Sequence, residues 1–296
     1  MNTQTRIVAL ALGACLALAI PGSPAAANTS GVAIPKAPKF DKGNAKKYGK
    51  QLAYYLRALD TGWVDSYAKS RMILKDSGGD KVERDTTQMI LEGADGNKSI
   101  ARFLSPADIR GVSALTHEHP KATDDSWLYL PASRRVRRIS GANRTASFQG
   151  TEFTYEDLST VEPRRYDWKY LKEDKVKSDG KTVPVSLLEA IPNFKDTGYS
   201  KLTVYLNQQS WRVERMDFYD KAGRLLKTLT FSKWKRYHGR FWRPHLMDMQ
   251  NRQTRKATAI KVKSMFLNLS LYKRKNGTPR SNLQDAQFTR RALENG

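Results

Sequence analysis

The sequence is poor in the residues that build covalent or metal-centred frameworks. Its 296 residues include one cysteine and four histidines. A single cysteine excludes an intramolecular disulfide framework, a zinc site made of cysteines and a CxxC redox pair. The sequence also lacks an apolar run close to the roughly 20 residues that a membrane-spanning helix needs.

Recognisable catalytic signatures are missing as well. The chain contains no Gly-x-Ser-x-Gly elbow, no phosphate-binding glycine loop and no nucleotide-binding fingerprint. Adjacent carboxylates occur at Asp124-Asp125 and Glu156-Asp157, but they lie in turn-like sequence, where such side chains cap or face solvent. The sequence therefore predicts no catalytic residue, no cofactor and no enzyme activity.

Acidic residues are scarce relative to basic ones. The chain has 52 Lys and Arg against 29 Asp and Glu, a formal net charge of +23. An excess of this size predicts an anionic partner, which could be a nucleic acid, a membrane surface or an acidic ligand.

The N-terminus narrows the choice of partner. Arg6 precedes an uncharged run from Ile7 to Ile20, followed by a Pro- and Gly-containing stretch and by three alanines that end at Ala27. This order predicts a signal peptide over residues 1–27 and a periplasmic location, which removes nucleic acid from the expected partners. Cys15 leaves a second interpretation open, a lipoprotein attached through that residue, although the apolar run continues beyond it.

The mature chain is predicted to begin with a flexible lead-in and a helix. Residues 28–43 are rich in Pro, Lys, Gly and Ala and are typical of a flexible segment. Asn44 is a candidate N-cap and Gly62 lies just beyond the predicted end of the helix. The apolar residues that recur at helical spacing are Tyr48, Leu52, Tyr55, Leu56 and Leu59.

The rest of the chain is dominated by strand signals. Short gaps containing glycine separate the strands and favour antiparallel hairpins. Residues 105–111 predict one short helix, with a serine cap, an early proline and a final glycine. The predicted strands are 64–74, 82–91, 99–104, 112–118, 127–130, 168–176, 182–191, 200–206, 211–219, 225–234, 241–249 and 257–267.

A sheet with this many strands curls, and wrapping around a helix is an economical way to cover its apolar face. We therefore predict a mainly β fold: an incomplete antiparallel β-barrel of roughly 11–13 strands around an N-terminal helix and short lid helices. No linker divides residues 44–296, which are expected to form a single domain and a monomer.

Several blocks of sequence carry a family resemblance. Residues 102–111 read RFLSPADIRG, residues 124–132 read DDSWLYLPA, and residues 148–158 read FQGTEFTYEDL. Together with later blocks at 196–201, 219–223, 242–245 and 288–293, they resemble the outer-membrane lipoprotein-sorting protein family of the LolA-like kind. The resemblance runs from about residue 50 to the C-terminus. Two departures from the family are the His117-Glu118-His119 sequence and a basic insertion over 271–282.

The resemblance implies a hydrophobic cavity, no cofactor, and periplasmic carriage of lipoproteins or lipids toward the outer membrane. The implied partners are lipoprotein or lipid acyl chains, an inner-membrane lipid exporter and an anionic membrane surface. A second hypothesis stays open: a non-catalytic adaptor of an envelope export complex that binds no lipid. A filled interior would favour the adaptor, and an open apolar cavity beneath the helix would favour the carrier.

Aromatic strand residues are the candidates for the cavity wall. Residues 127–130 are apolar on both faces, so the strand is covered on both sides or lines a cavity on one. An ordinary filled core is the alternative for each candidate. The predicted lining comprises Leu56, Leu59, Trp127, Tyr129, Phe153, Tyr155 and Trp211.

Two polar groups complete the list of candidates. His117 and His119 lie on one face of a strand at a spacing that a metal could use, but no third ligand is apparent, so we interpret them as exposed strand-end histidines. Four arginines crowd into residues 134–138, and strand alternation separates them between two faces. A solvated, partly ion-paired strand is one interpretation, and an anionic docking patch is the other; the patch comprises Arg134, Arg135, Arg137 and Arg138.

Overall fold

The computed structural model describes residues 34–268 and 283–294. Within these residues the chain forms thirteen strands, two α-helices and five short 3-10 helices. None of the described helices has the length and apolar character needed to cross a membrane. The predicted signal peptide, Cys15 and the basic insertion lie outside the described residues.

The N-terminal helix α1 (Ala45–Leu59) begins where the sequence predicts. The Asn44 side chain accepts a hydrogen bond from the Lys47 amide at 3.0 Å, which confirms the N-cap. Gly49 lies directly against the backbone of a strand, since a Cβ atom at this position would be 2.6 Å from the Tyr170 nitrogen. Glycine is therefore needed here for close approach of the helix to the sheet.

The strands that follow α1 form one antiparallel sheet, and twelve of the thirteen correspond to predicted ranges, whereas the strand over 135–139 was not among those ranges. They are β1 (Asp65–Lys75), β2 (Lys81–Leu91), β3 (Lys98–Ser105), β4 (Ser113–His117), β5 (Asp125–Leu130), β6 (Arg135–Ile139), β7 (Tyr166–Ser178), β8 (Lys181–Pro192), β9 (Lys201–Asn207), β10 (Val213–Tyr219), β11 (Leu225–Tyr237), β12 (Phe241–Asn251) and β13 (Ala257–Asn268).

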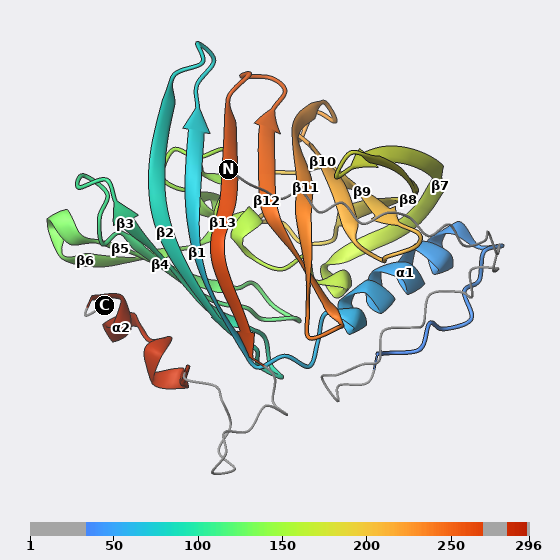
Figure 1. Cartoon of the computed structure of the whole chain (residues 1–296), viewed down its shortest axis with the longest axis horizontal. Helices are drawn as coiled ribbons and strands as arrows, with labels where there is room; N and C mark the ends of the chain where they lie inside the picture. Colours follow the sequence, from blue (N-terminus) through green and yellow to red (C-terminus); the bar gives the residue numbers. More distant parts are fainter. Residues whose placement is uncertain (1–33, 269–282, 295–296) are drawn as a thin grey trace, which may run out of the picture.

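The order of the strands leaves the sheet open. It runs β6-β5-β4-β3-β2-β1-β13-β12-β11-β10-β9-β8-β7, so that β6 and β7 are the two edges. The sheet curls, with α1 packed at the β7 end (Figure 1). This arrangement confirms the predicted mainly β fold, an incomplete antiparallel barrel around an N-terminal helix.

The connection between the two edge strands crosses the interior of the curled sheet. Residues 140–165, which we call the crossing segment, contain the 3-10 helices η2 (Gly141–Thr145), η3 (Glu156–Leu158) and η4 (Pro163–Arg165). Phe153 packs in the same buried cluster as Leu52 of α1 and Leu202 of β9. The crossing segment and α1 therefore cover the same face of the sheet, which we call the inner face.

The outer face is covered at one end by the C-terminus. The 3-10 helix η5 (Asp285–Gln287) leads to α2 (Arg290–Glu294), which lies near β4, β5 and β6 (Figure 1). Phe288 and Leu293 are buried against Ile100 and Leu115. Arg102 donates hydrogen bonds to the carbonyl oxygens of Ala292 and Leu293 in α2. The C-terminal block is thus part of the packed structure.

One expectation of local structure needs correction. Residues 105–111 form successive turns rather than a short helix, because the Gly111 amide bonds back to the Phe103 carbonyl at 2.9 Å and so closes the β3–β4 connection. The end of the expected flexible lead-in is held against α1. Phe40 contacts the rings of Tyr48 and Tyr55, with centroid distances of 5.7 and 5.9 Å.

Candidate functional site

A cavity of about 220 Å³ lies between the inner face and the crossing segment. Cross-strand partners form its wall, because residues paired in register project from the same face of a sheet. Phe218 pairs with Leu202, Met216 with Leu229, and Phe231 with Met247. The full lining is Arg144, Phe153, Glu156, Asp157, Ser159, Thr160, Val161, Arg165, Tyr166, Phe194, Tyr199, Leu202, Met216, Phe218, Leu229, Phe231 and Met247.

The two sides of this interior cavity differ in chemistry. Strands β9 to β12 contribute leucine, methionine and phenylalanine side chains, whereas the charged lining residues all come from the crossing segment. Ligand pockets in proteins typically enclose about 300–1,000 Å³, so the cavity is smaller than that range.

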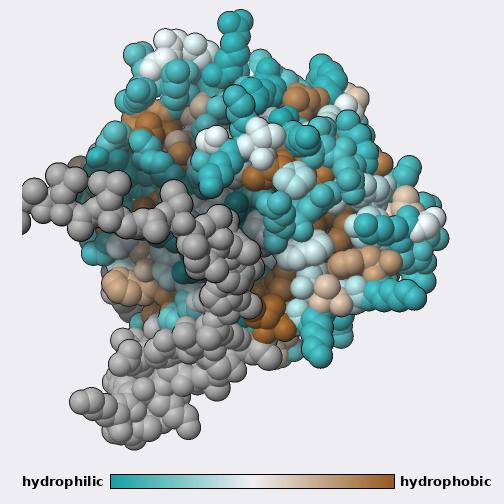
Figure 2. Space-filling model, turned by 45° about the vertical axis from the view of Figure 1, so that its right-hand side comes forward, coloured by the Kyte–Doolittle hydropathy of each residue, from teal (hydrophilic) through white to brown (hydrophobic). Residues whose placement is uncertain are grey.

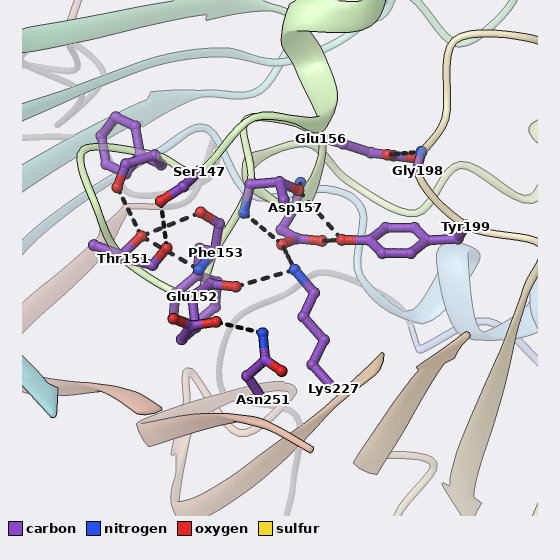
Figure 3. Close-up of polar contacts among 12 residues, drawn as sticks. Ser147, Thr151, Glu152, Phe153, Glu156, Asp157, Gly198, Tyr199, Lys227 and Asn251 are labelled. Atoms are coloured by element: carbon purple, nitrogen blue, oxygen red, sulfur yellow. Dashed lines mark hydrogen bonds and ion pairs between the residues drawn. The ribbon is translucent and has the colours of Figure 1, made fainter. Parts of the chain in front are cut away.

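The crossing segment is attached to the inner face by buried polar contacts (Figure 3). Lys227 of β11 extends from an apolar row and donates to Asp157 Oδ2 at 2.5 Å and to the Glu152 carbonyl at 3.0 Å. Both charged side chains are almost completely buried, with 2% and 4% of their area exposed. Because neither charge is exposed to water, each depends on the other for compensation.

Further contacts surround this ion pair (Figure 3). Tyr199 donates its hydroxyl to Asp157 Oδ1 at 2.8 Å, and burial raises the pKa of that phenol well above its usual value, so it remains a donor. Glu152 binds Asn251 of β12 through its side chain at 2.8 Å and Thr258 of β13 through its amide at 3.0 Å. One short stretch of the segment therefore contacts three adjacent strands.

A second buried ionic group lies at the polar end of the cavity. Arg144 and Arg165 each place a guanidinium nitrogen 3.2 Å from Asp124 Oδ2. Glu156 accepts hydrogen bonds from Thr197 Oγ1 and the Gly198 amide, and burial raises the pKa of its carboxyl group above the usual value. Asp124, Glu156 and Asp157 thus hold the crossing segment in place away from solvent, whereas Asp125 is partly exposed and pairs with Arg138.

The predicted lining residues fall into separate groups. Phe153 lines the interior cavity, and Leu56 and Trp211 pack at the edge of the same cluster. Tyr155 joins a neighbouring inner cluster with Phe148, at a ring distance of 5.5 Å. Leu59 is half-buried at the end of α1. The structure therefore brings Phe153, Leu56 and Trp211 together but separates the others from them.

Trp127 and Tyr129 lie on the opposite face of the sheet from the cavity. They pack with Phe288 and Leu293 beneath the C-terminal segment, whereas Leu128 between them joins the inner cluster. The expectation that they share a cavity wall with Phe153 is therefore corrected. Alternation along β5 sends Leu128 inward, and the C-terminal segment covers its two aromatic neighbours.

The side chains of His117, Glu118 and His119 do not converge on one point. His117 Nε2 is 2.7 Å from the Phe288 carbonyl, while His119 Nε2 is 3.1 Å from Asp125 Oδ2. Glu118 accepts hydrogen bonds from the Thr160 amide and hydroxyl. Among residues 34–268 and 283–294, no group of three or more His, Cys, Asp or Glu side chains is arranged to hold a metal ion.

A separate cleft of about 480 Å³ adjoins His119. Its other lining residues are small, charged or proline, and they include Asp95, Lys121, Glu162 and Arg164. Its lining includes no large aliphatic side chain and no Phe, Tyr or Trp, so this cleft does not match a guest made of acyl chains.

The four arginines lie at the β6 edge. Arg134 is outside the strand, in a left-handed conformation with φ 51°, so the predicted alternation holds only for the other three. Arg138 pairs with Asp125, and Arg135 and Arg137 are exposed. More widely, hydrophilic residues cover most of the side shown in Figure 2, with smaller hydrophobic areas between them.

Sequence reasoning missed most of the cavity. Lys227, Arg144 and Arg165 were not singled out, because a lysine or an arginine in a highly basic chain carries no signal of burial. The available signal was position: Lys227 occupies an inward position of β11, next to the apolar Phe218 in register. An inward lysine of this kind indicates a buried partner.

Comparisons with known proteins agree with the fold. A family model described as an uncharacterized protein matches residues 95–295. No curated protein matches the chain. Among solved structures, the chain is similar to a domain from Vibrio parahaemolyticus named for outer membrane lipoprotein sorting, at 38% identity and a TM-score of 0.75. That match covers 83% of this chain and 98% of the other.

Two further structures extend the similarity. A DUF1329 family protein from Desulfovibrio piger is 29% identical, with a TM-score of 0.74 and coverage of 84% of this chain and 99% of the other. A LolA superfamily protein from Nitrosomonas europaea is 17% identical, with a TM-score of 0.61 and coverage of 82% and 98%. At 17% identity, the similarity to the Nitrosomonas europaea protein supports the fold alone.

Proposed function

The chain belongs to the outer membrane lipoprotein-sorting protein family, and on that premise we propose that it carries acyl chains of lipoproteins or lipids inside the curled sheet. The observation that carries the proposal is the cavity walled by side chains of β9 to β12 and closed by the crossing segment. No catalytic step is part of the proposal, because carriage requires only burial and release.

Burial of an acyl chain supplies enough free energy for useful binding. Each methylene transferred from water contributes about 0.8 kcal/mol, so ten supply roughly 8 kcal/mol before the cost of ordering the chain. Micromolar affinity corresponds to about 8 kcal/mol. The cavity of about 220 Å³ is too small for such a chain unless the crossing segment moves, so loading and movement of the segment are coupled.

The attachment of the crossing segment fits such a cycle. Its polar contacts with β11, β12 and β13 are hydrogen bonds and an ion pair made by Glu152 and Asp157, and they add to the packing of Phe153. Polar contacts are directional, so they define one closed position, and water can replace them once the segment lifts. Apolar packing alone would define that position less sharply.

We propose that the carrier works in the cell envelope. The support is the order of charge, apolar residues and alanines in residues 1–27, together with the family. In this proposal residues 44–296 act as one periplasmic domain that receives its load from an inner-membrane lipid exporter, and an anionic membrane surface attracts its basic exterior. Intact-mass analysis should find a mature chain that begins at Asn28, whereas a diacylated Cys15 terminus would contradict this part.

The adaptor hypothesis is kept because part of the interior is filled. Beneath β1 to β5 the inner face packs Phe103 against Phe148, with ring centroids 5.5 Å apart, in a cluster with Met72 and Leu128. That half of the barrel is an ordinary core. If the cavity under β9 to β12 takes up no acyl chain, the protein acts as an adaptor that binds no lipid.

The test measures uptake of a fluorescent acyl probe by delipidated protein, with and without a fixed crossing segment. Glu152→Cys/Asn251→Cys replaces two contacting side chains, which a short thiol-reactive bifunctional reagent then joins. Arg71→Cys/Asp85→Cys is the matched control, because it joins contacting, partly exposed side chains of two adjacent strands. All variants carry Cys15→Ser.

The carrier proposal expects saturable uptake by the wild type and by the cross-linked control. Uptake should fall at least tenfold in the cross-linked Glu152→Cys/Asn251→Cys protein and should be normal before cross-linking. Absence of saturable uptake by the wild type at tens of micromolar probe would reject the carrier and favour the adaptor.

A further inference from the structure

The polar end of the interior cavity contains donors that the protein leaves unused. Among the described residues, only a few buried side-chain polar atoms lack a hydrogen-bond partner, and two belong to residues that line this cavity. They are Arg144 Nε and Ser159 Oγ. Arg144 is one of the largest fully buried side chains, with 2% of its area exposed. A buried donor without a partner is costly, which makes each a candidate contact for a ligand.

The rest of the Arg144 guanidinium is already engaged. Nη1 donates to the Asp124 carbonyl oxygen and Nη2 to Asp124 Oδ2, both at 3.2 Å. Arg165 Nη1 donates to the same Oδ2 atom, also at 3.2 Å. Two guanidinium groups therefore share one carboxylate, and this group of three side chains carries one surplus positive charge.

The neighbouring charges compensate this surplus only in part. Lys227 and Asp157 are a matched pair. Glu156 also lines the cavity, but it is held by a hydroxyl and an amide, and burial raises the pKa of its carboxyl group. Among the described residues, Asp124 is the only carboxylate that pairs with either guanidinium group. The two arginines therefore keep one positive charge available for an anionic group.

We infer that this polar end holds the head of an amphiphile with a single apolar chain and a carboxylate, with the chain lying along β9 to β12. The inference rests on the proposed function and specifies its cargo. Arg144 Nε and Ser159 Oγ donate to the head, while Leu202, Met216 and Phe218 contact the chain. One surplus positive charge matches one carboxylate better than a phosphate monoester, which carries between one and two negative charges near neutral pH.

The chain supplies matched controls for the two donors. Arg240 Nε and Ser210 Oγ are also buried without a partner, but neither residue lines the interior cavity. Substitution at these positions removes the same chemical group from a different place. A general effect of losing a buried donor is therefore separable from an effect on the head group.

The experiment compares two probes on the full-length protein: 11-(dansylamino)undecanoic acid and its methyl ester. Fluorescence titration at neutral pH should give a dissociation constant at least tenfold lower for the acid, because hydrogen bonds to a charged group contribute about 1.5–3 kcal/mol. Arg144→Gln should reduce this preference to about one. Ser159→Ala should reduce it about threefold while keeping the fold, because the hydroxyl has no protein partner.

The controls Arg240→Gln and Ser210→Ala should retain the tenfold preference, and so should the wild type in 0.3 M salt, since a buried contact is weakly screened. Equal binding of acid and ester by the wild type would overturn the inference and leave the carrier function intact. Stronger displacement of the probe by dodecyl phosphate than by dodecanoate would overturn the carboxylate assignment. Failure of both probes to bind would reject the carrier function and the inference together.

Discussion

The buried ion pair between Lys227 and Asp157 gives the most demanding test of how the crossing segment is held. Lys227→Met removes the ammonium group and keeps most of the apolar stem. Asp157 then loses its only ion-pair partner in the described structure and retains hydrogen bonds from the Thr154 amide at 2.7 Å and from Tyr199 at 2.8 Å. The variant thus leaves a buried carboxylate without a compensating charge.

The expected magnitude follows from that imbalance. Removal of one partner of a buried pair costs about 3–5 kcal/mol, mainly because the remaining charge stays desolvated. The double variant Lys227→Met/Asp157→Leu leaves neither charge and gains apolar surface beside Phe218 and Tyr199, whose rings lie 5.4 and 5.3 Å from the ammonium group. We expect it to be within about 2 kcal/mol of the wild type, so that the two single effects are strongly non-additive.

Urea unfolding of the wild type, both single variants and the double variant measures this cycle. The slope of the unfolding free energy against urea concentration must be equal among the four proteins for the comparison to be valid. Lys98→Met/Asp285→Leu and its single variants are the matched control, since this exposed pair should couple by less than about 1 kcal/mol. Additive effects at Lys227 and Asp157, within about 0.5 kcal/mol, would refute the reasoning.

Three further predictions concern pH, the arginine edge and the C-terminus. Burial raises the pKa of the folded Glu156 carboxyl above 4.5, so its contribution to stability is full below the unfolded pKa and is lost as pH rises through the folded pKa. Glu156→Gln should therefore gain stability relative to the wild type as pH rises from 4.5 to neutral in urea titrations; a constant difference would contradict this. Arg135→Glu/Arg137→Glu should weaken binding to anionic liposomes at low salt, and unchanged cosedimentation would reject the docking patch. Phe288→Ala should lower the unfolding free energy by about 3–5 kcal/mol, against less than about 0.5 kcal/mol for exposed Arg290→Ala, and equal thermal shifts would show that the C-terminal block is not packed.

Local sequence patterns were sufficient to predict the N-terminal helix and most of the strands. The helix from Ala45 to Leu59 was predicted with its Asn44 cap, because capping and helical spacing are decided within a few residues. The strands were found to within about two residues in most cases, because alternation and turn residues are also local. The short helix expected at 105–111 did not form, because a hydrogen bond from the Gly111 amide to the Phe103 carbonyl, across eight positions, closes the β3–β4 connection instead.

The face that a residue occupies could not be read in the same way. Trp127 and Tyr129 alternate with Leu128 as predicted, but alternation is symmetric between the two faces of a sheet. Which face became the interior was decided by the crossing segment on one side and by Phe288 and Leu293 on the other. These coverings come from sequence positions far from β5.

What the sequence by itself determined is therefore the curled antiparallel sheet, its N-terminal helix and the family, since each depends on local propensity or contiguous motifs. The tertiary structure decided the site. Asp157 and Lys227 are 70 positions apart, and Asp124 is 20 from Arg144 and 41 from Arg165. Because these charges are buried, each depends on a specific partner of opposite charge. They become buried only when the connection between the two edge strands carries the crossing segment across the sheet.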